Sequence, residues 1–230
     1  MKTEKKKAVI ILSGGLDSTT LLYDIVKKYG NQNILALSFN YGSKHNKVEL
    51  SKAMNTCFNL RVSHKILDLK NIFTNFKSSL LNHKDSEVIP QGHYEDNNMK
   101  STVVPFRNGI LLSLAVGIAE SYGIDKVYYG AHGGDHAIYP DCRSDFLEAI
   151  REASEFGTYI NVKILAPYIK MNKISILKKG IKLGVDYKNT HTCYCPNNQG
   201  QSCGKCGSCQ ERLEAFNKNK IKDPLEYYNK

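Results

Sequence analysis

The sequence predicts an α/β fold built on a doubly wound, mostly parallel sheet. Short apolar, strand-like runs alternate along the chain with helical segments of roughly 10 to 15 residues, which is typical of strand–helix–strand units. Right-handed crossovers between parallel strands place helices on both faces of such a sheet. Three polar segments follow predicted strands, and ligands of such sheets bind beyond the carboxyl ends of the strands. We therefore expect one pocket to collect residues 13–18, 40–45 and 131–143.

The first part of the chain supplies three strands and two helices. Residues 8–12 form an apolar run that ends at a pair of glycines, which indicates a buried strand followed by a turn. Residues 17–30 carry apolar side chains at helical spacing, and Gly30 stands where a helix is expected to stop. The same patterns predict strands at 33–42 and 64–69 and a helix at 46–59.

The alternation resumes after a long polar stretch at residues 70–99. This stretch shows no clear period, and connections of that length in a compact domain are usually lids, binding loops or disordered segments. Our hypothesis is a loop that closes over a bound intermediate and keeps water out. Beyond it the patterns predict helices at 108–123, 143–157 and 173–184 and strands at 125–132 and 159–168.

Composition and charge are those of an ordinary globular protein. Hydrophobic residues make up 41% of the 230 residues and charged residues 23%, which is enough to bury a core without covalent staples. No apolar run has the length of a secretion signal or a membrane span, so we expect a cytoplasmic protein. The net charge of +10 fits either a lysine-rich surface or an anionic partner. Because the lysines are spread along the chain, they do not indicate a nucleic-acid-binding tail.

The segment Ser13–Ser18, SGGLDS, has the ingredients of a phosphate-binding loop. Gly14 and Gly15 let the backbone approach a ligand closely, and the following helix offers free N–H groups at its N-terminus. The segment lacks the lysine of a Walker A loop and the spacing of a dinucleotide-binding loop. The residues alone also allow a simpler interpretation, a strand-to-helix turn capped by Asp17 or Ser18.

In this position between a strand and a helix, LSGGLDSTTLL resembles the pyrophosphate-binding loop of the ATP pyrophosphatase, or PP-loop, superfamily. These enzymes split ATP into AMP and pyrophosphate while they adenylate a substrate. The resemblance implies a Rossmann-like fold of the adenine nucleotide alpha hydrolase type, and ATP with Mg²⁺ as co-substrate. It also implies ATP binding by a run of eleven residues: Leu12, Ser13, Gly14, Gly15, Leu16, Asp17, Ser18, Thr19, Thr20, Leu21 and Leu22.

Three further motifs resemble those of the 7-cyano-7-deazaguanine synthase family, which makes a queuosine precursor. They are FNYGSKHNKVEL, VPFRNGILLSLA and GAHGGDHAIYPDCRSDF. A cysteine-rich stretch at residues 191–209, called the cysteine segment below, also resembles this family, and the resemblance as a whole runs from about Val9 to Phe216. It implies substrate binding by Asp141, Tyr139, Arg143 and His45. The Asp141 carboxylate would accept two hydrogen bonds from a guanine-like edge. A surface aspartate in a proline turn is the simpler alternative for Asp141, and a structural histidine is the alternative for His45.

The same resemblance implies three catalytic residues, Lys173, Arg107 and Asp135. Arg107 would hold a carboxylate or phosphate through two hydrogen bonds, and Lys173 would stabilise charge on the departing pyrophosphate. The simpler alternative for Arg107 is a surface arginine at the start of a helix, and for Lys173 it is an exposed lysine on a helix. Asp135 would carry Mg²⁺ for ATP, and capping of the following turn is an equally weighted alternative.

Five of the seven cysteines lie between residues 193 and 209. The spacing C-x-x-C-x-x-C of Cys203, Cys206 and Cys209 lets their thiolates turn onto one metal ion, and a fourth thiolate would complete a tetrahedral zinc site. Cys193 and Cys195 both qualify on position. An iron–sulfur cluster is the other metal interpretation, although the run lacks the Cys-Pro of bacterial ferredoxins.

The family pattern, a Cys-Tyr pair before the triple, favours Cys193 as the fourth ligand. Cys195 stays a rival, because the gap from Cys193 to Cys203 is one residue longer than the family's usual gap. A closed four-thiolate zinc site has no open position, so we expect a structural knuckle. We divide the chain into a nucleotide-binding domain, residues 1–188, and a C-terminal zinc-binding segment, residues 189–230, packed on its core. Of the other cysteines, Cys57 fits a buried core thiol and the role of Cys142 is open.

As a member of this family, the chain is expected to be an ATP-dependent carbon–nitrogen ligase. The resemblance implies conversion of 7-carboxy-7-deazaguanine and ammonia to 7-cyano-7-deazaguanine through adenylated acid and amide intermediates, with release of AMP and pyrophosphate. It also implies a homodimer with small-molecule partners only, without nucleic acid or membrane. Two rivals stay open. One is another PP-loop enzyme, such as a tRNA-thiolating relative that would use Cys142, and the other is a zinc-knuckle nucleic-acid binder on an inert scaffold.

Overall fold

The centre of the molecule is a five-stranded parallel sheet in the order β3-β2-β1-β4-β5. The computed structural model describes residues 6–82, 88–92, 97–134 and 138–228. The strands are β1 Ala8–Ile11, β2 Ile34–Asn40, β3 Ser63–Asp68, β4 Lys126–Tyr128 and β5 Lys163–Leu165. The predicted parallel sheet is confirmed. Most strands are shorter than predicted, and after β1, β2 and β4 the chain leaves the sheet to line the pocket beyond their carboxyl ends.

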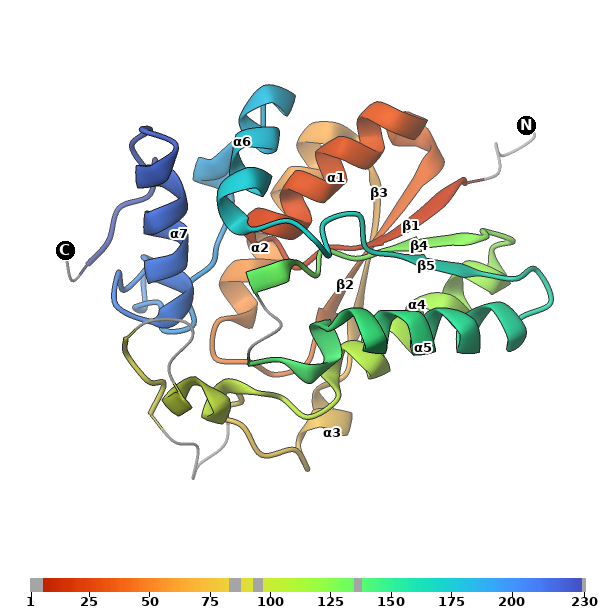
Figure 1. The fold of residues 1–230 in the computed structure, drawn as a ribbon, viewed down its shortest axis with the longest axis horizontal. Helices are drawn as coiled ribbons and strands as arrows, with labels where there is room; N and C mark the ends of the chain where they lie inside the picture. The colour runs from red at the N-terminus through yellow and green to blue at the C-terminus, as the bar shows by residue number, and fades with distance from the viewer. Residues whose placement is uncertain (1–5, 83–87, 93–96, 135–137, 229–230) are drawn as a thin grey trace.

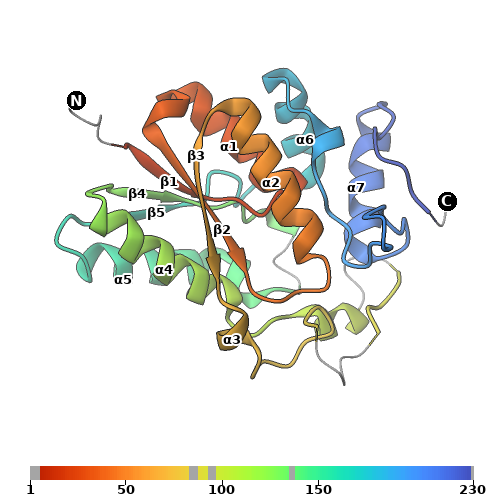
Figure 2. The same ribbon diagram turned by 180° about the vertical axis from the view of Figure 1, so that it is seen from behind.

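Helices cover both faces of this sheet (Figures 1 and 2). One face carries α1 (Leu16–Tyr29), α2 (Asn46–Leu60) and α6 (Lys173–Leu183), whose buried side chains pack with Ile10 of β1. The other carries α4 (Arg107–Ser121) and α5 (Ser144–Phe156), which pack with Val9. Successive side chains of a strand point to opposite faces, so β1 contributes side chains to two separate cores. The doubly wound architecture is therefore as predicted.

One described helical stretch, Asn98–Ser121, is long and apolar enough to cross a membrane by length and composition alone. Its second half is α4, which packs against β1 and β4. Leu112, Ala115 and Ala119 of this helix are fully buried in the core beneath the sheet. Packing on the sheet therefore accounts for the apolar character of this helix.

The polar stretch at 70–99 is more ordered than predicted in the parts that the structure describes. It contains the short helix α3 (Lys70–Phe73), and a 3-10 helix, Asn97–Thr102, begins near its end. Phe73, Leu80 and Leu81 are buried in the same core as α4. Residues 83–87 and 93–96 lie outside the described residues. The few apolar residues of this stretch are spaced irregularly, which is why they gave no periodic signal.

The C-terminal segment contains a helix that we did not predict, α7 (Gly207–Lys218). It packs on α6 at one end of the molecule (Figure 1). Arg212 fixes it from within, since its buried guanidinium donates to both carboxylate oxygens of Asp223, at 2.7 and 3.0 Å, and to Thr190 Oγ1 at 2.7 Å. The pattern failed here because α7 buries Ser208 and Arg212 where a helix usually buries apolar side chains. Three further 3-10 helices complete the described elements: Asn31–Asn33, Pro140–Cys142 and Tyr187–Asn189.

Candidate functional site

A cavity of about 210 Å³ lies at the carboxyl ends of β1, β2 and β4. It is lined by Leu12 after β1, Tyr41 after β2 and Gly130 after β4. This is the crevice where parallel sheets bind ligands, and its volume is many times that needed for one water molecule. Segments 13–18 and 40–45 reach the cavity as predicted. From 131–143 the described residues that line it are Ala131 and Cys142.

The loop Ser13–Ser18 presents a helix N-terminus to this cavity. Helix α1 begins at Leu16 with Gly15 as its N-cap, and no side chain caps it. The predicted alternative, a cap by Asp17 or Ser18, is therefore wrong. The backbone N–H of Gly15 points to Ser13 Oγ at 3.2 Å, and Ser13 and Ser18 hydroxyls lie 2.9 Å apart. A glycine cap leaves the first N–H groups of α1 available to an anion, at the positive end of the helix dipole.

Gly14 shapes this loop by letting α2 approach it. Its φ of +86° is left-handed, and a Cβ at this position would lie 2.3 Å from the carbonyl oxygen of Glu49. The last residues of the predicted ATP-binding run, Thr19–Leu22, are buried inside α1 and do not line the cavity. Thr20, for example, bonds its hydroxyl to Leu16 O and Tyr187 Oη. The part of the run that lines the cavity is thus Leu12, Ser13, Gly15, Leu16, Asp17 and Ser18.

Lys173, the first residue of α6, lies in the cavity wall between two carboxylates. Its Nζ is 3.5 Å from Asp17 Oδ2 and in direct contact with Glu211 Oε2 of α7. Only 6% of its side chain is exposed, so the predicted alternative of an exposed lysine is wrong. His132, which is buried after β4, places its Nε2 3.7 Å from the same Asp17 oxygen. A cation is therefore fixed beside the glycine loop.

Arg107 begins α4 and lines the same cavity as the glycine loop. Its Nη1 donates to the hydroxyl of Tyr41 at 3.3 Å. Asp141 does not line the cavity among the described residues. Its buried Oδ2 accepts the backbone N–H of Asn108 at 2.8 Å, in the first turn of α4. The predicted alternative of a surface aspartate is therefore wrong, although Asp141 does lie in the proline turn Pro140–Cys142.

His45 and Glu49 form a pair on the first turn of α2, with His45 Nε2 and Glu49 Oε2 3.6 Å apart. His45 is only 2% exposed, and its Nδ1 has no hydrogen-bond partner in the described structure. Burial, with smaller contributions from His191 and Arg107, lowers the pKa of His45 to about 3. Burial raises the pKa of Glu49 to about 8 against the opposing effect of Arg107. The pair therefore faces the cavity with a neutral imidazole and a carboxyl group that titrates near neutral pH.

The remaining predicted substrate and catalytic residues lie outside the described cavity wall. Tyr139 is buried, and its hydroxyl lies 2.9 Å from Thr102 Oγ1 and 3.3 Å from Tyr194 Oη. Arg143 is exposed at the N-cap of α5. Asp135, together with residues 136 and 137, lies outside the residues that the structure describes.

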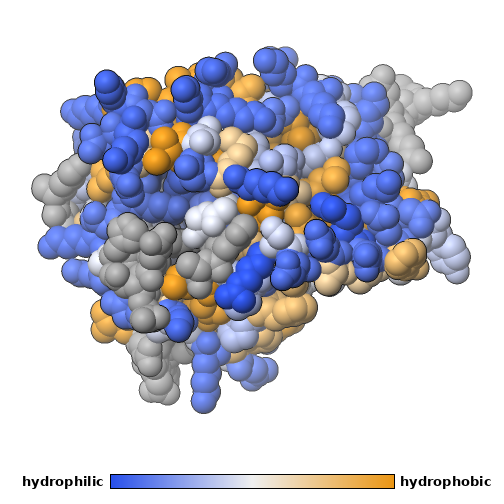
Figure 3. Space-filling view, in the orientation of Figure 1, coloured by the Kyte–Doolittle hydropathy of each residue, from blue (hydrophilic) through white to orange (hydrophobic). Residues whose placement is uncertain are grey.

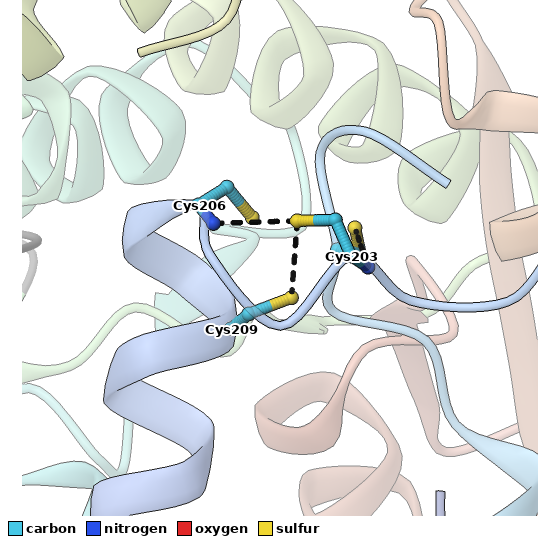
Figure 4. A group of neighbouring side chains, drawn as sticks. Cys203, Cys206 and Cys209 are labelled. Carbon is cyan, nitrogen blue, oxygen red and sulfur yellow. Dashed lines mark hydrogen bonds between the residues drawn. The ribbon is translucent and has the colours of Figure 1, made fainter. Parts of the chain in front are cut away.

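Four buried cysteines come together at the C-terminal segment: Cys193, Cys203, Cys206 and Cys209. Their sulfur atoms all lie within 4.8 Å of one another, and Figure 4 shows Cys206 and Cys209 converging on Cys203 from the start of α7. Backbone N–H groups of Cys195 and Cys203 point at Cys193 Sγ, each at 3.2 Å. N–H donors of this kind stabilise metal-bound thiolates, so the donor set fits a tetrahedral zinc ion. The rival Cys195 is exposed and its thiol stays outside the cluster.

The cysteine segment also forms part of the cavity wall, through His191, Thr192, Tyr194 and Ser208. His191 donates its backbone N–H to Gly14 O at 2.9 Å, and the ring of Tyr194 packs 5.3 Å from that of His45. We described this segment from the sequence as an addition to the core. The structure shows in addition that it borders the glycine loop directly.

Two acidic residues of the site received no role from the sequence. Glu49 stands in a motif that we quoted, and its position four residues after His45 was a usable signal, since such residues share a helix face. Glu211 gave no signal, because it lies on the helix that was not predicted and meets Lys173 only through tertiary packing. Cys57 is buried in the core with a pKa raised to about 12, as expected for an inert thiol.

Comparisons with known proteins agree on one family. Residues 7–220 match the family model described as queuosine biosynthesis protein QueC. The 7-cyano-7-deazaguanine synthase of Hahella chejuensis is 53% identical over 96% of this chain and 93% of its own length. The 7-cyano-7-deazaguanine synthase 2 of Colwellia psychrerythraea is 54% identical over 96% of this chain and 99% of its own. Among solved structures, the NMN synthetase of Francisella tularensis has a TM-score of 0.51 at 14% identity, over 95% of this chain and 79% of that one, which supports the fold alone.

Proposed function

The chain belongs to the family of the queuosine biosynthesis protein QueC, and from this premise we propose that it is an ATP-dependent carbon–nitrogen ligase. The proposed reaction joins 7-carboxy-7-deazaguanine with ammonia and yields 7-cyano-7-deazaguanine, AMP and pyrophosphate. The names of the relatives supply the product, and the substrates and steps below are our inference from the site.

The observation that carries this proposal is the convergence of an uncapped helix N-terminus and two cations on one cavity. The N–H groups at the start of α1 face the same space as Lys173 and Arg107. An uncapped N-terminus beside a lysine suits the pyrophosphate part of ATP, and an arginine in the wall of the same cavity suits a substrate carboxylate. An adenylation needs these two anions side by side, because a carboxylate oxygen must attack the α-phosphorus.

In the first activation, the substrate carboxylate attacks the α-phosphorus of ATP and pyrophosphate leaves. Lys173 is placed to stabilise the charge on the departing pyrophosphate, and Asp17 holds the ammonium group of Lys173 toward the loop. Ammonia then attacks the acyl carbon and displaces AMP, which leaves the amide. Positioning and charge stabilisation carry this step, and no covalent enzyme intermediate is required.

The second activation repeats the same chemistry on the amide. The amide oxygen attacks the α-phosphorus of another ATP, pyrophosphate leaves again, and departure of AMP leaves the nitrile. One cavity can perform both steps, because in each an oxygen attacks the same phosphorus while the same leaving group departs. Arg107 lines this cavity and can hold the reacting oxygen in both activations.

The other predicted substrate residues keep proposed roles that follow their positions. His45 presents its buried, unpartnered Nδ1 in the cavity wall, which suits a hydrogen bond to the heterocycle. Asp141 would act indirectly, because its carboxylate holds the first turn of α4 and thereby Arg107. Tyr139 supports Tyr194 of the wall, and Arg143 would require a movement of its loop to reach substrate.

We also propose that the four-cysteine cluster holds one structural zinc ion and that Mg²⁺ accompanies ATP, with Asp135 as its protein ligand. A closed set of four thiolates supplies folding energy and no site for chemistry. Mg²⁺ would neutralise phosphate charge on the bound nucleotide. We expect the enzyme to act in the cytoplasm as a homodimer, which sedimentation analysis of the purified protein would test.

The test of the proposed function is a direct assay. The protein is incubated with ATP, Mg²⁺, ammonium and 7-carboxy-7-deazaguanine, and AMP, pyrophosphate and the deazaguanine products are quantified. We expect AMP release that depends on the deazaguanine acid, with the nitrile as final product. Absence of acid-dependent AMP would contradict the ligase function, and tight, salt-sensitive RNA binding without turnover would favour a nucleic-acid binder instead.

A further inference from the structure

Glu49 is a cavity carboxylate without a part in the mechanism above. Among the described residues, Asp17 and Glu49 are the ones that bring a carboxylate to the cavity wall. Asp17 is paired with Lys173, whereas the Glu49 carboxylate lies 3.6 Å from His45 Nε2. The Glu49 side chain is 14% exposed, so a bound substrate can reach it while bulk water largely cannot.

The groups around Glu49 come from four parts of the chain. They are His45 on its own helix, Tyr41 after β2 and Arg107 of α4, together with His191 and Tyr194 of the cysteine segment, which lie next to His45. Burial keeps both histidines neutral at pH 7, with pKa values of about 3 and 4, and raises the pKa of both tyrosines. Arg107 is therefore the cation that faces Glu49, and its attraction does not outweigh burial. The resulting pKa of about 8 suits a group that exchanges protons near neutral pH.

The proposed reaction has to remove protons from nitrogen repeatedly. Ammonium predominates over ammonia at neutral pH and has no lone pair with which to attack a carbon. The amide must later lose both of its N–H protons to become a nitrile. Lys173 and Arg107 are cations and cannot accept these protons, so the site needs a base near the nitrogen.

Building on the proposed function, we propose that the Glu49 carboxylate is the general base that takes protons from the reacting nitrogen. First, an N–H bond of ammonium breaks, its electron pair stays on nitrogen, and the proton forms an O–H bond on Glu49. Nitrogen then bonds to the acyl carbon as the C–O bond to AMP breaks, and AMP leaves with that electron pair. Glu49 returns its proton to solvent and takes the surplus N–H proton of the new amide.

The same carboxylate serves the second activation. After the amide oxygen has bonded to the α-phosphorus, Glu49 takes one N–H proton to give the neutral imidate and releases it to solvent. It then takes the last N–H proton, whose electron pair becomes the third carbon–nitrogen bond as AMP departs with the C–O pair. The position of Glu49 fits this role, because its turn of α2 lies directly against Gly14 of the nucleotide loop.

The experiment compares wild type with Glu49→Gln, which keeps the size of the side chain and removes the base. We expect kcat with ammonium to fall about 10²-fold or more, with KM for the deazaguanine acid nearly unchanged. The rise of kcat with pH through the Glu49 titration is expected to disappear. Glu148→Gln, at an exposed position on α5, is the matched control and should behave like wild type.

A second nucleophile separates loss of the base from damage to the site. Hydroxylamine is largely unprotonated at neutral pH, so hydroxamate formation by Glu49→Gln should stay near the wild-type rate, as should exchange of labelled pyrophosphate into ATP. If Glu49→Gln is as active as wild type with ammonium, or loses activity equally with both nucleophiles, or changes only KM, the inference is overturned. A wild type without acid-dependent AMP overturns the proposed function itself, and that result is distinct from each of these.

Discussion

Lys173 is held between the carboxylates of Asp17 and Glu211. Two carboxylates fix its ammonium group beside the glycine loop, so the lysine needs little reorganisation when pyrophosphate charge develops. The motif predicted that Lys173 belongs to the site, and the structure shows its side chain in the cavity wall. The motif did not indicate what holds it there. The partner Glu211 lies 38 residues further along the chain, on a helix whose polar inward face hides it from pattern analysis.

Replacement of Lys173 by Met should slow the reaction strongly. We expect kcat to fall about 10²- to 10³-fold, because the charge on the leaving pyrophosphate loses its stabilising cation. Steady-state assays of AMP release check this. Lys179→Met is the matched control, since Lys179 lies on the same helix and pairs with Asp24 at a partly exposed site. Equal rates for the two variants would remove Lys173 from the mechanism.

Glu49 should also affect how the free energy of unfolding depends on pH. Its pKa is about 8 in the folded protein against 4.5 ordinarily, so between these pH values the folded state binds one more proton than the unfolded chain. The contribution of Glu49 to the free energy of unfolding therefore falls as pH rises through this window, by at most about 1.4 kcal/mol per pH unit.

Urea unfolding of wild type and Glu49→Gln at several pH values between about 5 and 8 measures this contribution, since other titrating groups cancel in the difference. The stability of the variant relative to wild type should increase with pH. A difference that stays constant would mean that Glu49 has an ordinary pKa in the folded protein.

At the scale of elements, the glycine loop depends on how closely α2 approaches it. Gly14→Ala would place a methyl group 2.3 Å from a backbone oxygen at a left-handed φ. We expect a loss of about 2 kcal/mol or more in the free energy of unfolding, together with weaker ATP binding. Gly117→Ala in α4 is the control, because no atom beyond its chain neighbours and the backbone of its own helix lies within 4 Å of the new methyl group. It should be neutral or stabilising by up to about 1 kcal/mol, and a similar loss in both variants would contradict this account.

The cysteine segment makes a second prediction at this scale. Cys193→Ser should lose bound zinc, since it removes one of four converging thiolates, whereas Cys195→Ser should retain it. Zinc per chain, measured by elemental analysis of the purified proteins, decides between them. Because metal binding supplies folding energy, Cys193→Ser should also loosen α7 and its wall of the cavity. Retention of zinc by Cys193→Ser together with its loss from Cys195→Ser would reverse the assignment.

Elements and motifs were predictable to different degrees. Apolar periodicity predicts the helices α1, α2, α4, α5 and α6 and the strands β1, β2, β4 and β5, because each buries apolar side chains in one of the two cores. Strand β3 lies at the edge of the sheet, and its side chains are mostly exposed. Apolar periodicity did not predict helix α7, because a buried ion pair between Arg212 and Asp223 holds this helix in place. The contacts of individual side chains were harder to predict than the elements. The motif predicted that Asp141 binds substrate, whereas in the structure its carboxylate accepts a hydrogen bond from the backbone N–H of Asn108 at the start of α4.

At the scale of the whole molecule, the sheet order brings the segments that line the cavity together. Placing β1 at the centre puts the glycine loop between the ends of β2 and β4, so segments far apart in sequence share one cavity. Figure 3 shows one face covered mostly by hydrophilic residues, with apolar residues in scattered patches, which agrees with lysines spread along the chain. The cysteine segment completes the molecule by closing one side of this cavity.

The central claim is that one cavity activates the same carbon twice by adenylation. Its most direct test uses 7-carboxy-7-deazaguanine with both carboxylate oxygens replaced by a heavy isotope of oxygen. We predict two AMP for each nitrile, each AMP carrying one heavy oxygen, because each carboxylate oxygen leaves on the phosphorus that it attacked. AMP without the heavy isotope would show that water cleaves ATP and would contradict the claim.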